Sequence, residues 1–113
     1  MSNSVDFEKF QRDTGLDDPS LKELYEGFLQ ELLEEKDKLL RQLSGKDYSN
    51  LYKTVHNIKG ISGSYMAMTV FNRSSELSAR LKAERTEEVG AWVNILVNDI
   101  IEAAGEIISF CGK

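Results

Sequence analysis

The chain is poor in the residues that cross-link a fold or bind a soft metal. Its 113 residues include one cysteine, Cys111, and one histidine, His56. A single cysteine excludes an intramolecular disulfide, and so few cysteine and histidine ligands argue against a zinc-type centre. We therefore expect no metal site in this chain. Its length suits one globular domain, so residues 1–113 are taken as a single domain with one apolar core.

Long apolar runs and excess positive charge are also missing. No apolar stretch approaches the roughly 18 residues of a membrane span, and Met1 to Ser4 lack the basic and then apolar pattern of a signal peptide. The formal net charge is −5, which argues against binding to nucleic acid or to anionic membranes. We expect a cytoplasmic protein that binds neither.

Proline is nearly absent as well, and the apolar residues recur at the three-and-four spacing of amphipathic helices. This spacing predicts a short helix over about residues 5–14 and a long one from about 18 to 44. A third is expected from near 47 to about 66, a fourth from about 69, and a fifth from about 86 to 111. Four long helices with short connections predict an all-α fold, an antiparallel four-helix bundle with a short additional N-terminal helix.

Helix boundaries are predicted from capping residues. Ser4, Asp18, Thr69 and Thr86 each precede an apolar-periodic segment, where their side-chain oxygens suit the N-cap position. Pro19 suits the first helical position after Asp18. Glycines at 15 and 45 suit the ends of the first two helices.

Charge is unevenly distributed along the chain. Residues 51–80 carry a formal charge of +3, whereas residues 1–50 carry −5 and residues 81–113 carry −3. No Asp or Glu occurs between residues 48 and 75. A locally basic segment suits a small anion or an acidic partner, although a helix pair that is poor in acids by chance gives the same count.

The basic segment contains the histidine, on the third predicted helix. With Leu51 at zero and about 100° per residue, the apolar stripe centres near 10° and His56 lies near 140°. The imidazole is therefore expected to face solvent, with Lys59 one turn further on. A neutral imidazole is a nucleophile near pH 7, and an ammonium group beside it offsets the charge of an anion bound there.

Two glycines interrupt the same helix, at Gly60 and Gly63. A glycine inside a helix costs about 1 kcal/mol relative to alanine, so some other effect must offset it. One explanation is close packing of helices. The other is that bare backbone clears space beside the imidazole for a phosphoryl group or a partner protein.

These residues resemble a known family. His56-Asn57-Ile58-Lys59-Gly60, followed by Gly63, is similar to the His-x-x-Lys-Gly signature of histidine-containing phosphotransfer (HPt) domains. Those domains are four-helix bundles of about this size, and the resemblance covers nearly the whole chain. It implies that a histidine carries a phosphoryl group to or from an aspartate of a response-regulator receiver domain.

The resemblance also assigns roles to individual residues. It implies that His56 is the phosphoacceptor, that Lys59 stabilises the phosphoryl charge, and that Gly60 and Gly63 keep the imidazole accessible. Tyr52, one turn before His56, borders the expected docking surface or is ordinary helix surface. Many family members have glycine ten positions after the histidine, where this chain has Met66, so the exit from the helix is expected to differ.

Partners follow from the same resemblance. We expect a receiver domain, a hybrid sensor histidine kinase, or both, with the acidic pocket and its Mg²⁺ on the receiver and no cofactor in this chain. One copy suffices for the chemistry, so a monomer is expected. The chain has no Walker-type phosphate loop, which argues against autonomous kinase or ATPase activity.

Two alternatives remain open at this stage. One alternative to the phosphorelay intermediate is the phosphorylatable domain of a chemotaxis-type histidine kinase, which a kinase rather than a receiver would phosphorylate. The chain is also compatible with a non-catalytic helical adaptor whose surface histidine is incidental.

Overall fold

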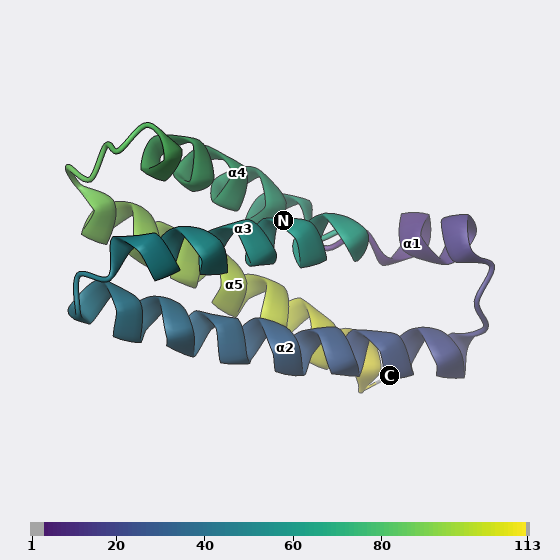
Figure 1. Ribbon diagram of the computed structural model, residues 1–113. Coiled ribbons are helices and arrows are strands. Elements are labelled where there is room, and N and C mark those ends of the chain that lie inside the picture. Colours follow the sequence, from purple (N-terminus) through teal and green to yellow (C-terminus); the bar gives the residue numbers. More distant parts are fainter. Residues whose placement is uncertain (1–3, 113) are drawn as a thin grey trace.

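A computed structural model describes residues 4–112 of the chain. Met1 to Asn3, where the sequence shows no signal-peptide pattern, lie outside the described residues. The fold is all-helical, as predicted: four long helices and one short leading helix (Figure 1). Their bounds are α1 Phe7–Thr14, α2 Asp18–Ser44, α3 Tyr48–Ser64, α4 Met68–Lys82 and α5 Val89–Cys111.

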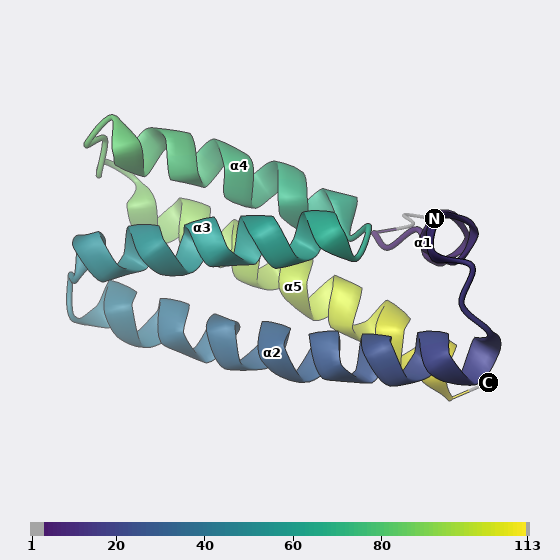
Figure 2. The same ribbon diagram turned by 45° about the vertical axis from the view of Figure 1, so that its right-hand side comes forward.

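The four long helices form an antiparallel bundle. Successive helices run in opposite directions, and the chain makes a short turn at each end of the bundle (Figures 1 and 2). Helix α2 packs against α3 and α5, and α4 packs against the same two helices. The predicted inward stripes account for this packing, because each long helix buries one apolar side against its neighbours. The largest side chains of the shared core are Tyr25, Phe28, Leu21, Leu32, Leu39, Leu51, Ile58, Leu77, Leu96, Ile100 and Ile107.

Helix α1 covers one end of the bundle rather than joining its sides. The segment before it is held by an isolated antiparallel bridge between Val5 and Ala67 and by a 2.9 Å hydrogen bond from Asp6 N to the Met66 oxygen. The Phe7 ring stacks on Phe110 of α5, with ring centroids 4.2 Å apart. An aromatic cluster fills this end of the molecule, made of Phe7, Phe10, Tyr25, Phe28, Tyr65 and Phe110.

The N-cap predictions for the first two helices were wrong by one or two residues. Asp6, not Ser4, caps α1 by accepting from Lys9 N. Ser4 is buried, and its own backbone N–H donates to the Glu106 carboxylate on α5. Asp17, not Asp18, caps α2 by accepting from Ser20 N at 2.9 Å. An aspartate pair offers two candidate caps, and only the residue outside the helical backbone takes the role.

Neither threonine caps a later helix. Helix α4 begins at Met68 after Ala67, and α5 begins at Val89 after Glu88; neither has a side-chain cap. The bridge to Val5 and burial of Ala67 set the start of α4, so Thr69 already lies inside the helix. Helix α5 starts where Val89 enters the core, beyond Thr86. Tertiary contacts have replaced local caps at both positions.

The exit from α3 has a left-handed residue at Met66, with φ of 59°. Glycine adopts this conformation without the steric cost that a Cβ introduces. The backbone therefore turns in the way that glycine would favour, although the chain has methionine at that position. The predicted end of α3 is confirmed within two residues, because the helix ends at Ser64.

Candidate functional site

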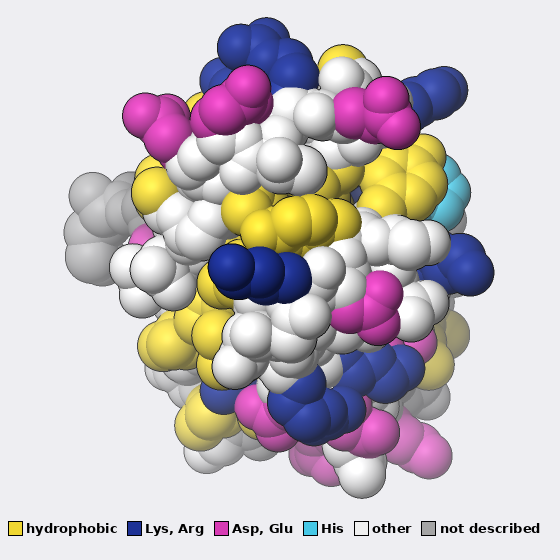
Figure 3. Space-filling model, turned by 60° about the vertical axis from the view of Figure 1, so that its left-hand side comes forward, with side chains coloured by type: hydrophobic (Ala, Val, Ile, Leu, Met, Phe, Trp, Pro, Cys, Tyr) yellow, Lys and Arg dark blue, Asp and Glu magenta, His cyan; other side chains and the backbone are white. Residues whose placement is uncertain are grey.

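The candidate site lies on the outer side of α3. Asp47 caps this helix by accepting from Asn50 N, and the buried residues Leu51, Val55 and Ile58 fix its rotation against the core. That rotation leaves His56 exposed in the middle of the helix, as the helical wheel predicts. Figure 3 shows the histidine side chain on the molecular surface beside a hydrophobic side chain.

Tyr52 lies next to the imidazole. The ring centroids of Tyr52 and His56 are 6.1 Å apart with an interplanar angle of 21°, which is a loose stack along one side of the helix. Tyr52 is half-buried and packs against the core. One side of the imidazole is thereby bordered by an aromatic ring, and His56 is otherwise exposed.

Lys59 follows His56 by three residues and is half-buried. Residues three apart on a helix are neighbours on its surface. Within residues 4–112, no carboxylate forms an ion pair with this ammonium group. The positive charge is therefore available to an anion that approaches the imidazole.

The two glycines of α3 differ in their surroundings. A Cβ added to Gly60 would meet no atom within 4 Å, so nothing in the fold requires glycine there. A Cβ added to Gly63 would lie 3.0 Å from Cδ1 and 3.1 Å from Cε1 of Phe71 on α4. Close helix packing thus accounts for Gly63. Access to the imidazole remains the hypothesis for Gly60.

Two of the four basic side chains in residues 51–80 make contacts with other residues of the fold. Arg73 Nε donates a 2.8 Å hydrogen bond to the Asp99 carboxylate, which raises the pKa of the guanidinium. The Arg80 guanidinium lies 4.0 Å from the ring centroid of Trp92, a cation–π contact. Both contacts join α4 to α5. Only Lys53 and Lys59 remain on α3 to give the candidate site its charge.

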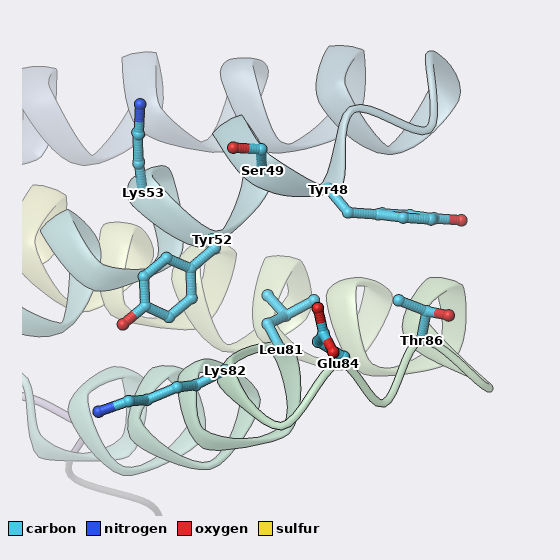
Figure 4. Close-up of a pocket in the computed structure, with 8 residues that line it drawn as sticks. All are labelled: Tyr48, Ser49, Tyr52, Lys53, Leu81, Lys82, Glu84 and Thr86. Atoms are coloured by element: carbon cyan, nitrogen blue, oxygen red, sulfur yellow. The ribbon is translucent and has the colours of Figure 1, made fainter.

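A pocket of about 540 Å³ opens beside Tyr52, between the start of α3 and the end of α4. Figure 4 shows its lining, with Leu81 between Tyr52 and Thr86. The sequence did not predict this pocket, because it forms only where two segments some thirty residues apart meet. The one available signal was the spacing of Tyr48 and Tyr52, four residues apart on one side of a helix. The lining consists of Tyr48, Ser49, Tyr52, Lys53, Leu81, Lys82, Glu84 and Thr86.

The remaining reactive side chain is engaged elsewhere. Cys111 is half-buried at the end of α5, 3.6 Å from the Lys22 carbonyl oxygen, and burial raises the pKa of its thiol. A raised pKa lowers the thiolate fraction, and the side chain packs against the core, so Cys111 is a packing residue. No group of three or more metal-ligating side chains occurs in residues 4–112.

Among residues 4–112, no helix combines the length and apolarity that a bilayer span requires. No family model, curated protein or solved structure matches the chain.

Proposed function

We propose that this protein is a histidine phosphotransfer intermediate of a two-component phosphorelay, in which His56 carries the phosphoryl group. The observation that carries the proposal is the place of the imidazole: exposed, mid-helix and on the wall of a four-helix bundle. A histidine whose role is structural usually has its ring buried or hydrogen-bonded. No hydrogen bond to the His56 ring forms within residues 4–112.

The proposed step exchanges one bond at phosphorus. A lone pair on an imidazole nitrogen attacks the aspartyl phosphate of a receiver domain and forms an N–P bond. The P–O bond to aspartate breaks, and its electron pair leaves with the aspartate carboxylate. The other ring nitrogen keeps its proton, so the product is a phosphorylated imidazolium. The reverse step returns the phosphoryl group to a receiver.

The chain needs little further catalytic equipment for this step. Phosphoryl transfer depends mainly on in-line positioning and on neutralising the charge of the phosphoryl oxygens. Lys59 supplies one positive charge beside the ring, and the exposed backbone at Gly60 leaves space for the approaching group. The family resemblance places Mg²⁺ and its carboxylate ligands on the receiver.

The proposal also specifies partners and location. The partners are a receiver domain, a hybrid sensor histidine kinase, or both, and the protein acts in the cytoplasm. The acid-free surface of α3 supports an acidic partner, because no carboxylate between residues 48 and 75 would repel it.

A transfer assay tests the proposal. Receiver domains encoded in the same genome are phosphorylated with labelled acetyl phosphate, freed of reagent and mixed with the protein. We expect label on this chain that is labile in acid and stable in base, and none on the His56→Gln variant. Normal labelling of that variant would reject His56 as the acceptor.

Two further arms separate the alternatives. Labelling by a histidine kinase and ATP without any receiver would favour the chemotaxis-type kinase domain. Binding to a receiver without transfer, unchanged in His56→Ala, would favour the helical adaptor.

A further inference from the structure

We infer that the pocket between α3 and α4 receives an apolar side chain from the acidic receiver surface that docks over His56. This inference rests on the proposed function and deepens it, because it states which side of α3 the partner covers. The pocket is built by the first turns of α3, the end of α4 and the turn that follows.

The position of the pocket links it to the histidine. Tyr52 forms one wall of the pocket and also lies beside His56, with the two ring centroids 6.1 Å apart. A partner surface that reaches the imidazole from the α4 side must pass over Tyr52. The contact between Gly63 and Phe71 places α4 on this same side of α3.

The lining of the pocket suits an apolar group. Leu81 is 8% exposed and forms the floor, and the half-buried rings of Tyr48 and Tyr52 form walls. Aromatic and aliphatic side chains that fill such pockets are the groups that anchor protein interfaces. A volume of about 540 Å³ lies within the range of known ligand pockets and leaves room for a phenyl or branched aliphatic side chain.

The charges at the rim orient the partner. Lys82 lies at the Tyr52 end of the pocket, and its ammonium group points to the same side as the Tyr52 hydroxyl (Figure 4). Glu84 lies toward the Thr86 end, and Lys53 points away on the other side of α3 (Figure 4). A carboxylate next to the inserted side chain therefore belongs beside Lys82, where opposite charges attract, and away from Glu84.

Occupancy of the pocket would also act on the imidazole. A side chain packed against Tyr52 restricts that ring to one rotamer, and the ring borders His56. The partner then positions the nucleophile by filling a neighbouring pocket, which is how remote contacts assist a transfer step.

The test uses the full chain and the receiver that labels His56 in the transfer assay, held in its active form with beryllofluoride. Methyl and ring resonances of the protein are followed by NMR while this receiver is added. We expect shifts at Leu81, Tyr48 and Tyr52 and none at Leu24 of α2, which is 41% exposed and lies outside the pocket. Unshifted Leu81 methyls in the complex would overturn the inference.

Three variants test the charges. Lys82→Glu is expected to raise the Kd for the receiver about tenfold, and Glu84→Gln to lower it about twofold. Arg12→Glu on α1 changes the net charge by the same amount as Lys82→Glu but lies at the other end of the bundle, so it should alter Kd by less than twofold. Equal effects of Lys82→Glu and Arg12→Glu would contradict docking at the pocket.

The outcomes separate the two proposals. If His56 is labelled but the resonances of the pocket residues do not shift and the Kd values of the variants are unchanged, the docking inference is wrong. The proposed phosphotransfer function is then unaffected. Failure of every receiver to label His56 would reject the function, and the docking inference with it.

Discussion

A Cβ atom on Gly63 would lie 3.0 Å from Cδ1 of Phe71, which is closer than folded proteins normally allow. Helix α4 therefore lies against bare backbone of α3, about two helical turns beyond the histidine. Gly60, three residues earlier, faces open space. The two glycines of the motif thus differ in their surroundings, and substitution separates them.

Alanine at these positions is expected to act in opposite directions. Gly60→Ala should raise the free energy of unfolding by about 0.5–1 kcal/mol, because alanine favours the helix and its methyl group meets nothing. Gly63→Ala gains the same helix propensity but must displace the Phe71 ring, at a cost of about 1–3 kcal/mol. Urea denaturation measures both values. Equal stability of the two variants would show that the α3–α4 contact imposes no constraint.

Lys59→Ala should slow phosphotransfer to His56 by about tenfold, the effect of losing about 1.4 kcal/mol of charge stabilisation in the transition state. Its free energy of unfolding should change by less than about 0.5 kcal/mol, because Lys59 forms no ion pair within the described residues. The rate of label transfer and the urea midpoint give the two readouts. Lys59→Arg is the matched control, since it keeps the charge and should keep most of the rate. A large loss of stability in Lys59→Ala would make this residue structural instead.

Tyr25→Phe should lower the free energy of unfolding by about 1–2 kcal/mol at pH 7. The fully buried Tyr25 donates a 2.7 Å hydrogen bond to the Tyr65 carbonyl oxygen, and the substitution leaves that acceptor unpaired. Tyr65 is the C-cap residue of α3, so the bond holds the end of the helix that carries His56. Thermal unfolding of the two proteins side by side measures the loss, and an unchanged Tm would contradict it.

Tyr25 also predicts a dependence on alkaline pH. Burial, with the nearby Asp6 charge, raises the pKa of Tyr25 well above its ordinary value of 10. The unfolded chain therefore loses this proton first, so the stability is present below pH 10 and falls as the pH rises above it. Between pH 10 and 11 the wild type should lose about 1 kcal/mol more than Tyr25→Phe, whose ring cannot ionise. Parallel curves for the two proteins would show that Tyr25 ionises normally in the fold.

Glu106→Gln should release the segment that leads into α1. Its carboxylate accepts hydrogen bonds from the backbone N–H groups of Ser4 and Val5, both at 3.0 Å. An amide offers one acceptor oxygen in place of two, so we expect a cost of about 1–3 kcal/mol for this contact. Hydrogen exchange in α1 should accelerate, whereas α3 should exchange as before. Glu23→Gln on the exposed surface of α2 is the control for the change in charge; equal exchange in both variants would contradict the anchoring role of Glu106.

Much of the fold was predictable because a core-facing helix repeats its apolar residues at a fixed period. The periodic apolar residues Val70 and Leu77 of α4 and Val93 and Ile100 of α5 are buried in the core, and α2 has the predicted bounds at both ends. The caps were less predictable. Local capping competes with tertiary contacts, and the bridge between Val5 and Ala67 joins segments that no local rule relates.

The site was predictable to a similar extent. A helical wheel is enough to predict that His56 faces solvent and that Lys59 and Gly60 lie near it. It does not show that Arg73 is paired with Asp99 or that Arg80 lies on Trp92, so the count of positive charge overstated what is available to a partner. The pocket beside Tyr52 was also missed, because its walls come together only when α4 has packed on α3.

The central claim is that His56 carries the phosphoryl group, and mass spectrometry of the chain after mixing with a phosphorylated receiver tests it most directly. Fragmentation under neutral or basic conditions should place the added phosphoryl group on His56 alone. A phosphoryl group on any other residue, or none with every receiver and kinase supplied, would contradict it.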